Sequence, residues 1–182
     1  MLHQPILQGK PTTRITVMQG QAMVSAGPRV ELTTVLGSCV ATCLFDPEVE
    51  LGGMNHFLLA EPPVGQASVD EHYGVYLMEV LINQMLAHGA SKTRLRAHLY
   101  GGANLHASMA RIGTANAEFA RSFLLHERIP LIREDLGGTQ ARRVDFRPAN
   151  GKVRCRSVEN DMAPAPQPIH RPTAASGDVE LF

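Results

Sequence analysis

The chain has 182 residues, of which 44% are hydrophobic and 19% charged, enough for one domain with a substantial core. Basic and acidic residues number 17 each and form no long run of one sign, which argues against a surface that binds nucleic acid. No apolar run approaches the roughly 18 residues of a membrane span, and the first 14 residues lack the pattern of a secretory signal. We therefore expect one cytoplasmic domain without membrane insertion.

In chain order, the first half is rich in predicted strands. Short apolar segments separated by glycine predict strands at residues 15–18, 22–24, 30–36, 39–45 and 53–59. Apolar residues then recur at intervals of three and four between residues 68 and 88, which predicts an amphipathic helix. Ser68 with Glu71 forms a capping box at its start, and Gly89 supplies the cap at its end.

The second half alternates strands and helices. Residues 95–100 predict a strand that the two following glycines halt, and a second helix opens near Thr114. A strand at residues 131–133 precedes a hairpin of residues 143–147 and 152–156, whose turn contains an Asn-Gly pair. This order of elements predicts the α/β class.

The chain divides into three predicted parts: an N-terminal extension at residues 1–14, one domain at residues 15–159 and a tail at residues 160–182. The tail is rich in proline and alanine and has too few large apolar residues to offset the entropy cost of ordering, so we expect it to be disordered. Its last five residues, 178–182, are acidic and apolar and could form a docking peptide. A frayed terminus without function explains them more simply.

Three cysteines, Cys39, Cys43 and Cys155, form an odd set that argues against a disulfide framework, so we expect reduced thiols. The Cys-x₃-Cys spacing has no second closely spaced ligand pair, which argues against a zinc site. No glycine loop continues into Lys-Ser/Thr, and the glycines at 101 and 102 lack the spacing of a dinucleotide-binding loop. The sequence thus predicts neither a metal nor a cofactor.

Two short segments carry candidate chemistry. Cys39 directly follows the turn formed by Gly37 and Ser38, and turns beside strands can aim backbone amides at a substrate oxygen. An unpaired cysteine alone, however, is usually a small buried hydrophobe. His56 lies inside an apolar strand segment, where a lone histidine is usually a core residue. Neither residue by itself indicates catalysis.

A predicted hairpin brings the two segments together. The Asp-Pro pair at residues 46–47 is typical of a type I turn, and a hairpin centred there places Cys39 opposite His56. Their Cβ atoms would then lie about 4.5–5.5 Å apart. A longer loop would place Cys43 opposite His56 instead. Both registers put the three side chains on one face; the preceding glycine turn favours Cys39 as the reactive thiol and leaves Cys43 a structural one.

Several further motifs accompany these segments in a fixed order. They are Leu-Gly-Ser-Cys-Val at 36–40, Gly-Gly-Met-Asn-His-Phe at 52–57, Tyr-Gly at 73–74, Tyr-Gly-Gly-Ala at 100–103, Ile-Gly-x-x-Asn at 112–116 and Asp-Leu-Gly-Gly at 135–138, followed by Arg143 before an alternating strand. With these motifs the chain resembles the CheD family of chemoreceptor glutamine deamidases over residues 17–156. The resemblance implies a single-domain layered sandwich of the α/β/β type, with a mixed, largely antiparallel sheet and two main helices.

The resemblance also implies a reaction and its residues. It makes Cys39 the nucleophile and His56 its base in a protein-glutamine glutaminase, which deamidates glutamine side chains of chemotaxis receptors. A threonine six residues before the cysteine completes the family's triad; that position is Thr33 here, and the adjacent Thr34 leaves the choice between the two open. In such a reaction the thiolate attacks the side-chain amide, ammonia leaves, and water releases glutamate from the thioester.

The remaining expectations concern the transition state, the partners and the alternatives. Amides of the turn at Gly37 and Ser38 could hold the oxyanion that forms during attack. The expected substrates are receptor cytoplasmic domains, and family members also partner with a CheC-type phosphatase. One alternative is a non-catalytic adaptor that docks on receptors or on such a phosphatase. A thiol protease is disfavoured because the sequence shows no sign of an extended substrate groove, and the intact pair of Cys39 and His56 favours the deamidase.

Overall fold

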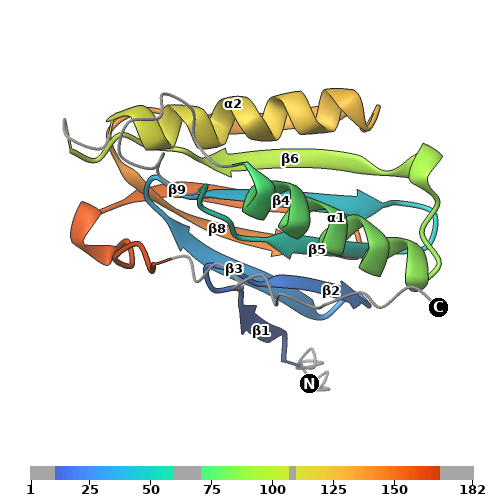
Figure 1. Ribbon diagram of the computed structural model, residues 1–182. Coiled ribbons are helices and arrows are strands. Elements are labelled where there is room, and N and C mark those ends of the chain that lie inside the picture. The colour runs from blue at the N-terminus through green and yellow to red at the C-terminus, as the bar shows by residue number, and fades with distance from the viewer. Residues whose placement is uncertain (1–10, 60–70, 107–109, 169–182) are drawn as a thin grey trace, which may run out of the picture.

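The computed structural model describes residues 11–59, 71–106 and 110–168 (Figure 1). In chain order its elements are β1 (Thr13–Thr16), β2 (Ala22–Ala26), β3 (Val30–Leu36), β4 (Val40–Asp46), β5 (Leu51–Asn55), α1 (His72–Ala87), η1 (Lys92–Arg94), β6 (Arg96–Gly101), α2 (Ala110–His126), β7 (Leu131–Leu136), β8 (Ala141–Arg147), β9 (Lys152–Val158) and η3 (Asn160–Met162), where η denotes a short 3₁₀ helix.

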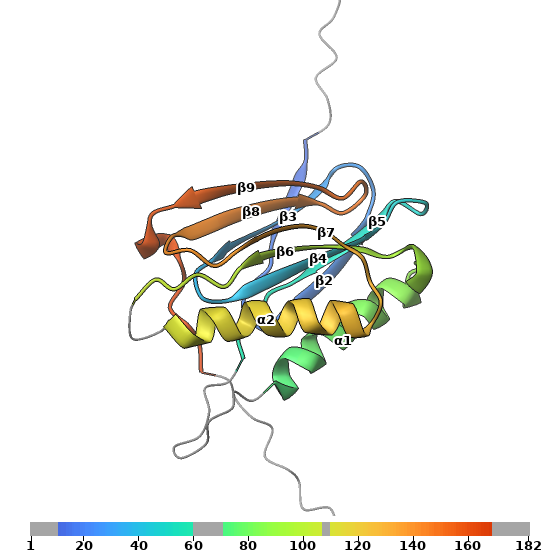
Figure 2. The same cartoon turned by 90° about the horizontal axis from the view of Figure 1, so that it is seen from above.

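These elements form three layers (Figure 2). A five-stranded sheet in the order β2-β5-β4-β6-β7 lies in the middle, the two helices cover one of its faces, and a four-stranded sheet in the order β1-β3-β8-β9 covers the other. The pairs β1–β3 and β6–β7 are parallel, and the pairs β2–β5, β4–β5, β4–β6, β3–β8 and β8–β9 are antiparallel. The expected α/β/β sandwich with two main helices is confirmed.

The central strand β4 shows why the sheet is covered on both sides. All of its residues are buried, since helices pack on one face of the sheet and the second sheet packs on the other. A strand buried on both faces needs a nearly continuous apolar run rather than alternation. The predicted apolar run at 39–45 matches this position in the middle layer.

Helix α1 ends as the sequence predicts. Gly89 adopts the left-handed conformation, with φ of 100°, and its N–H donates to the carbonyl of Leu86 at 3.0 Å. The predicted start at Ser68 lies outside the described residues. Glu71 stands at the N-cap position without a side-chain cap hydrogen bond.

Several predicted boundaries are wrong. Helix α2 begins at Ala110, before the predicted start near Thr114, because Gly113 interrupts the helical pattern in the sequence. The glycine is needed there: a Cβ on Gly113 would lie 2.5 Å from the carbonyl oxygen of Ala103. Strand β1 begins at Thr13, inside the predicted N-terminal extension.

Within the described residues, none of the helices has the length and apolar character needed to span a bilayer.

Both predicted registers of the β4–β5 hairpin are also wrong. A four-residue turn that ends at Glu50, with φ of 50°, joins the two strands. This turn is longer than the turn of the first predicted register and shorter than the turn of the second. Cys43 therefore lies opposite Met54. Strand β5 ends one residue before His56, which therefore lies past the regular strand and is paired with neither Cys39 nor Cys43.

The predicted tail is ordered where it leaves the domain. Residues 160–168 follow β9 and lie against the end of the sandwich, and the main chain of Gln167 bonds the side chain of Gln19. The prediction of disorder is therefore wrong for these residues. Residues 169–182, including the predicted docking peptide, lie outside the described residues.

Two glycines allow a test of how closely the middle sheet approaches the Cys39 turn. Gly101 has φ of 110°, and a Cβ there would overlap the carbonyl oxygen of Cys39. Gly27 has a similar φ of 103°, but nothing lies within 4 Å of a Cβ at that position. The two positions share the backbone strain and differ in the overlap.

We expect Gly101→Ala to lower the free energy of unfolding by about 3 kcal/mol or more, because it adds steric overlap to left-handed strain. Gly27→Ala should lower it by about 1 kcal/mol, from the strain alone. Urea denaturation of both variants measures the difference. Equal losses in the two variants would contradict the overlap.

Candidate active site

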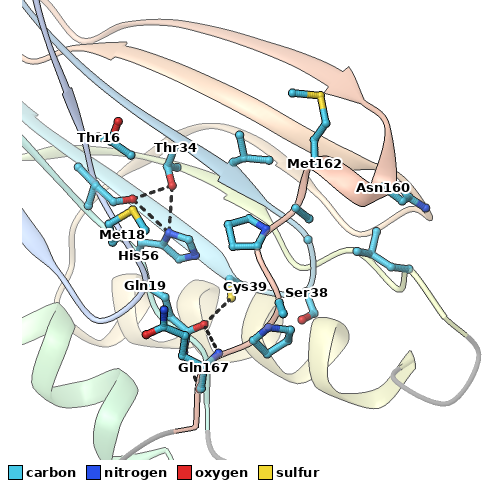
Figure 3. Close-up of a pocket in the computed structure, with 18 of the residues that line it drawn as sticks. Thr16, Met18, Gln19, Thr34, Ser38, Cys39, His56, Asn160, Met162 and Gln167 are labelled. Atoms are coloured by element: carbon cyan, nitrogen blue, oxygen red, sulfur yellow. Dashed lines mark hydrogen bonds between the residues drawn. The ribbon is translucent and has the colours of Figure 1, made fainter.

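A cavity of about 340 Å³ opens beside Cys39 and His56 (Figure 3). Its walls come from residues 16–19, from the segment between residues 34 and 39, and from residues 160–167. The structure thus brings Gly37, Ser38, Cys39 and His56 into one cavity, as the sequence predicts, and leaves Thr33 outside its walls.

The turn that carries Cys39 crosses from one sheet to the other. Strand β3 belongs to the four-stranded sheet and β4 to the five-stranded sheet, so residues 37–39 link the two layers. The carbonyl of Gly37 accepts a hydrogen bond from the N–H of Ala103 at 2.9 Å. The carbonyl of Cys39 accepts one from the N–H of Gly102 at 2.8 Å. Both donors follow β6, which fixes the turn from the interior.

The middle carbonyl of this turn, that of Ser38, is held by Asn116 of α2. Asn116 Nδ2 donates to it at 2.7 Å, and Asn116 Oδ1 accepts from the N–H of Leu59 at 2.8 Å. Asn116 is fully buried, so both bonds fix its amide. In the sequence Asn116 was noted only as the last residue of the Ile-Gly-x-x-Asn motif and was given no role. The signal that could have found it is a lone amide side chain on the apolar face of a predicted helix.

The captured carbonyls also set the direction of the amides in the turn. In a trans peptide the C=O of one residue and the N–H of the next point in opposite directions. The carbonyls of Gly37 and Ser38 point to interior donors, so the N–H groups of Ser38 and Cys39 point away from those donors. These two amides can donate to a substrate oxygen.

His56 is held at its main chain and at its ring. Its carbonyl accepts from the N–H of Gly20 at 2.8 Å, and its N–H donates to the carbonyl of Gln21 at 3.0 Å. The ring Nδ1 lies 2.9 Å from Thr34 Oγ1 and 3.3 Å from the carbonyl oxygen of Val17. The imidazole is therefore fixed on the side of Nδ1.

These contacts decide which ring nitrogen carries the proton. The Thr34 hydroxyl donates to the carbonyl of Val17 at 2.8 Å, so its oxygen is left to accept from His56 Nδ1–H. The Val17 carbonyl can only accept, which favours the same tautomer. Nε2 then keeps a free lone pair, and Figure 3 shows the ring between Thr34 on one side and Cys39 on the other.

Thr33, which the sequence predicts beside His56, points elsewhere. Neighbouring residues of a strand face opposite sides of a sheet. The Thr33 hydroxyl donates to Asp145 Oδ1 at 2.7 Å, and the other carboxylate oxygen of Asp145 accepts from Arg154 at 2.9 Å. The threonine that contacts His56 is therefore Thr34 and not Thr33. The sequence had left both threonines open.

Burial keeps the thiol and the imidazole neutral at rest. Cys39 is 7% exposed and His56 is 3% exposed. Desolvation raises the pKa of the Cys39 thiol to about 12. Desolvation also lowers the pKa of the His56 imidazole to about 4, with the hydrogen bond to the Val17 backbone acting in the opposite direction. The resting pair is a thiol with a neutral imidazole rather than a thiolate with an imidazolium.

The other two thiols lie apart from this cavity. Cys43 is fully buried in β4, and burial raises its pKa. Cys155 on β9 is half-buried, and its thiol donates to Asp135 at 3.4 Å. Among the described residues, Cys39 is the cysteine that lines the cavity, and no three His, Cys, Asp or Glu side chains in that part of the chain are grouped to hold a metal ion.

Sequence reasoning missed Gln19 and the start of the tail. Gln19 Oε1 lies 3.8 Å from Cys39 Sγ, and the Gln19 amide bonds the main chain of Gln167 at 3.0 and 3.1 Å. A main-chain partner can belong to any residue type, so no side-chain pattern reveals such a contact. Residues 160–167 thereby become a wall of the cavity.

Comparison with known proteins gives one consistent family. The family model described as CheD, chemotactic sensory transduction, matches residues 58–157. The chain is 54% identical over 174 residues to a probable chemoreceptor glutamine deamidase CheD of Zymomonas mobilis, covering 93% of this chain and 92% of that protein. It is 49% identical over 177 residues to a probable chemoreceptor glutamine deamidase CheD of Caulobacter sp. strain K31, covering 94% of each.

Among solved structures, the hypothetical protein YfiH of Bacillus licheniformis is similar with a TM-score of 0.44 and 15% identity, over 65% of this chain and 51% of that one.

We predict that His56 stays uncharged down to about pH 4, because its ring is desolvated. NMR of the ring should show titration near pH 4 in the folded protein and near pH 6.5 in the urea-unfolded chain. The unfolded state binds more protons between these values, so this group's contribution to stability is lost as the pH falls from about 6.5 to 4. His56→Gln should remove that part of the pH dependence. Titration near pH 6.5 in the folded protein would contradict the prediction.

Proposed function

This chain belongs to the CheD family, and we propose that it deamidates glutamine side chains of chemoreceptors with Cys39 as nucleophile and His56 as base. The observation that carries the proposal is the shared cavity in which this thiol and imidazole lie, with Nδ1 of the ring held by Thr34. The reaction is that of a protein-glutamine glutaminase: it converts glutamine to glutamate and releases ammonia.

The first step joins proton transfer to attack. An amide requires a nucleophile stronger than water and a proton for its departing nitrogen. His56 Nε2 takes the Sγ proton while Cys39 attacks the side-chain carbonyl carbon, and Thr34 holds Nδ1 as the ring becomes imidazolium. Because the thiol pKa is high and the imidazole pKa is low, the thiolate does not accumulate before the attack.

The second step releases ammonia and the product. The N–H groups of Ser38 and Cys39 stabilise the oxyanion, and losing one such donor costs about 2.7–4 kcal/mol. The imidazolium protonates the amide nitrogen, the C–N bond breaks, and ammonia leaves a thioester on Cys39. Water that His56 deprotonates attacks the thioester; the C–S bond breaks, glutamate forms, and the imidazolium returns its proton to Cys39. Gly37 supports the turn through its carbonyl.

The proposed substrates are receptor cytoplasmic domains, so the proposed reaction takes place in the cytoplasm. Each converted glutamine adds a negative charge to the receptor, and such a charge alters receptor packing and signalling. The family resemblance also predicts a CheC-type phosphatase as a partner, which stays a prediction. A purely adaptor role is less well supported, because docking alone does not require a desolvated thiol–imidazole pair.

We expect the wild-type protein to add about 1 Da for each converted glutamine in a receptor cytoplasmic fragment, as the amide nitrogen is replaced by oxygen. Intact-mass measurement and peptide mapping detect the conversion and its position. Cys39→Ala should abolish it, and Cys43→Ala should retain it, since Cys43 lies outside the cavity. Conversion of glutamine by Cys39→Ala would contradict Cys39 as the nucleophile. If the wild type converts no glutamine in several receptors, the adaptor role is favoured.

The two adjacent threonines provide a matched pair. Thr34→Val should lower kcat/KM about 10- to 100-fold, because the ring of His56 loses its partner at Nδ1. Thr33→Val should leave kcat/KM within about threefold but lower the free energy of unfolding by about 1–3 kcal/mol, because Asp145 loses a buried donor. Steady-state kinetics and urea denaturation of both variants separate the two effects. The reverse pattern would restore Thr33 to the triad.

A further inference from the structure

Gln19 occupies a fixed position beside the nucleophile. The next residue, Gly20, donates its N–H to the carbonyl of His56 at 2.8 Å and has φ of 85°. A Cβ on Gly20 would lie 2.6 Å from the Tyr73 hydroxyl, so α1 confines the loop from the other side. The main chain that carries Gln19 is therefore tied to the main chain of the proposed base.

The orientation of the Gln19 amide follows from two main-chain contacts. The N–H of Gln167 can only donate, and it lies 3.1 Å from the oxygen, Oε1. The carbonyl of Gln167 can only accept, and it lies 3.0 Å from the nitrogen, Nε2. These contacts fix Oε1 as the atom that accepts the thiol hydrogen bond of Cys39, at 3.8 Å. An acceptor thus faces the position where a substrate amide must bind.

Residues 163–167 cross the cavity beside Cys39. At one end, Cβ of Ala163 lies 3.3 Å from a Cβ built on Gly37; at the other end, Gln167 bonds Gln19. Gly37 and Gln19 both line the cavity around Cys39, and Figure 3 shows the segment passing from Met162 to Gln167 in front of it. Because the main chain of Gln167 bonds the Gln19 amide, a glutamine side chain that binds Gln19 must displace these contacts.

We propose that the Gln19 side chain binds the carboxamide of the substrate glutamine. In the free protein the main chain of Gln167 takes up the hydrogen bonds of the Gln19 amide instead. This inference rests on the proposed function. Gln19 Oε1 accepts an N–H of the substrate amide, while the substrate carbonyl lies toward the amides of Ser38 and Cys39. The product carboxylate has no N–H to donate and places an oxygen against Oε1. With Oε1 directed at the substrate, as it is directed at Cys39 in the free protein, Gln19 distinguishes glutamine from glutamate and favours release of the product.

The first test measures binding without turnover, in full-length Cys39→Ala. Two receptor cytoplasmic fragments are compared, one with Gln and one with Glu at the position that peptide mapping identifies. We expect the Gln fragment to bind about tenfold more tightly, and Gln19→Met, which has a similar length but no amide, to lower this ratio at least about fivefold. A purely structural role for Gln19 would weaken both fragments equally and would overturn the inference.

The second test removes the competing contact. Gln167→Pro lacks the main-chain N–H that donates to Gln19, whereas Gln167→Ala keeps it. We expect KM for the receptor fragment to fall about fivefold in Gln167→Pro and to stay at the wild-type value in Gln167→Ala. The inference requires both results, so an unchanged KM in Gln167→Pro overturns it.

The two tests also separate this inference from the proposed function. If the wild type converts receptor glutamine and the Gln-to-Glu binding ratio is the same in Gln19→Met, the inference alone is wrong. If the wild type converts no receptor glutamine, the proposed function fails and the inference fails with it.

Discussion

The capture of three successive carbonyl groups, those of Gly37, Ser38 and Cys39, is the constraint on which the site depends. A buried carbonyl without a donor costs about 1–3 kcal/mol, so other conformations of this turn are disfavoured by several such losses together. The two main-chain donors, the N–H groups of Gly102 and Ala103, can approach because Gly101 and Gly102 both adopt positive φ, at 110° and 63°. Hydrogen bonds to main-chain carbonyls thus set the position of the proposed nucleophile, Cys39, and its thiol can be replaced without releasing the turn.

Burial of the thiol–imidazole pair has two consequences that act together. A desolvated site strengthens every hydrogen bond made to charge that develops during a reaction. The same desolvation leaves Cys39 protonated at rest, and a neutral, covered thiol is a poor target for oxidation or alkylation. Reactivity then depends on a substrate amide that accepts the attack at the moment the proton moves to His56.

Patterns of apolar residues predicted the helices and most strands, and the resemblance to the CheD family predicted the layers, but neither predicted the contacts within the site. The C-terminal cap of α1 followed from Gly89, because a left-handed cap favours glycine strongly. The predicted hairpin registers were wrong because the register depends on the length of the turn. The turn ends at Glu50 in a left-handed conformation, which glutamate rarely adopts and which the sequence therefore does not predict. The sequence left the choice between Thr33 and Thr34 open, because alternation says that two neighbours face opposite sides of a sheet without saying which side holds the histidine. The composition of the tail predicted disorder from its start, because the main-chain contact of Gln167 with Gln19 does not depend on residue type.

The position of the site between the two sheets explains why its parts lie so far apart in the sequence. Thr34 belongs to β3 in the four-stranded sheet, whereas His56 follows β5 in the five-stranded sheet, so their hydrogen bond spans the interface between the layers. The turn of Cys39 is the connection between the same layers. A shift of one sheet over the other would therefore separate His56 from Thr34 and move Cys39 at the same time. Tight packing of the two sheets is accordingly a condition for the proposed chemistry as well as for stability, and that chemistry requires the whole sandwich rather than the local loop alone.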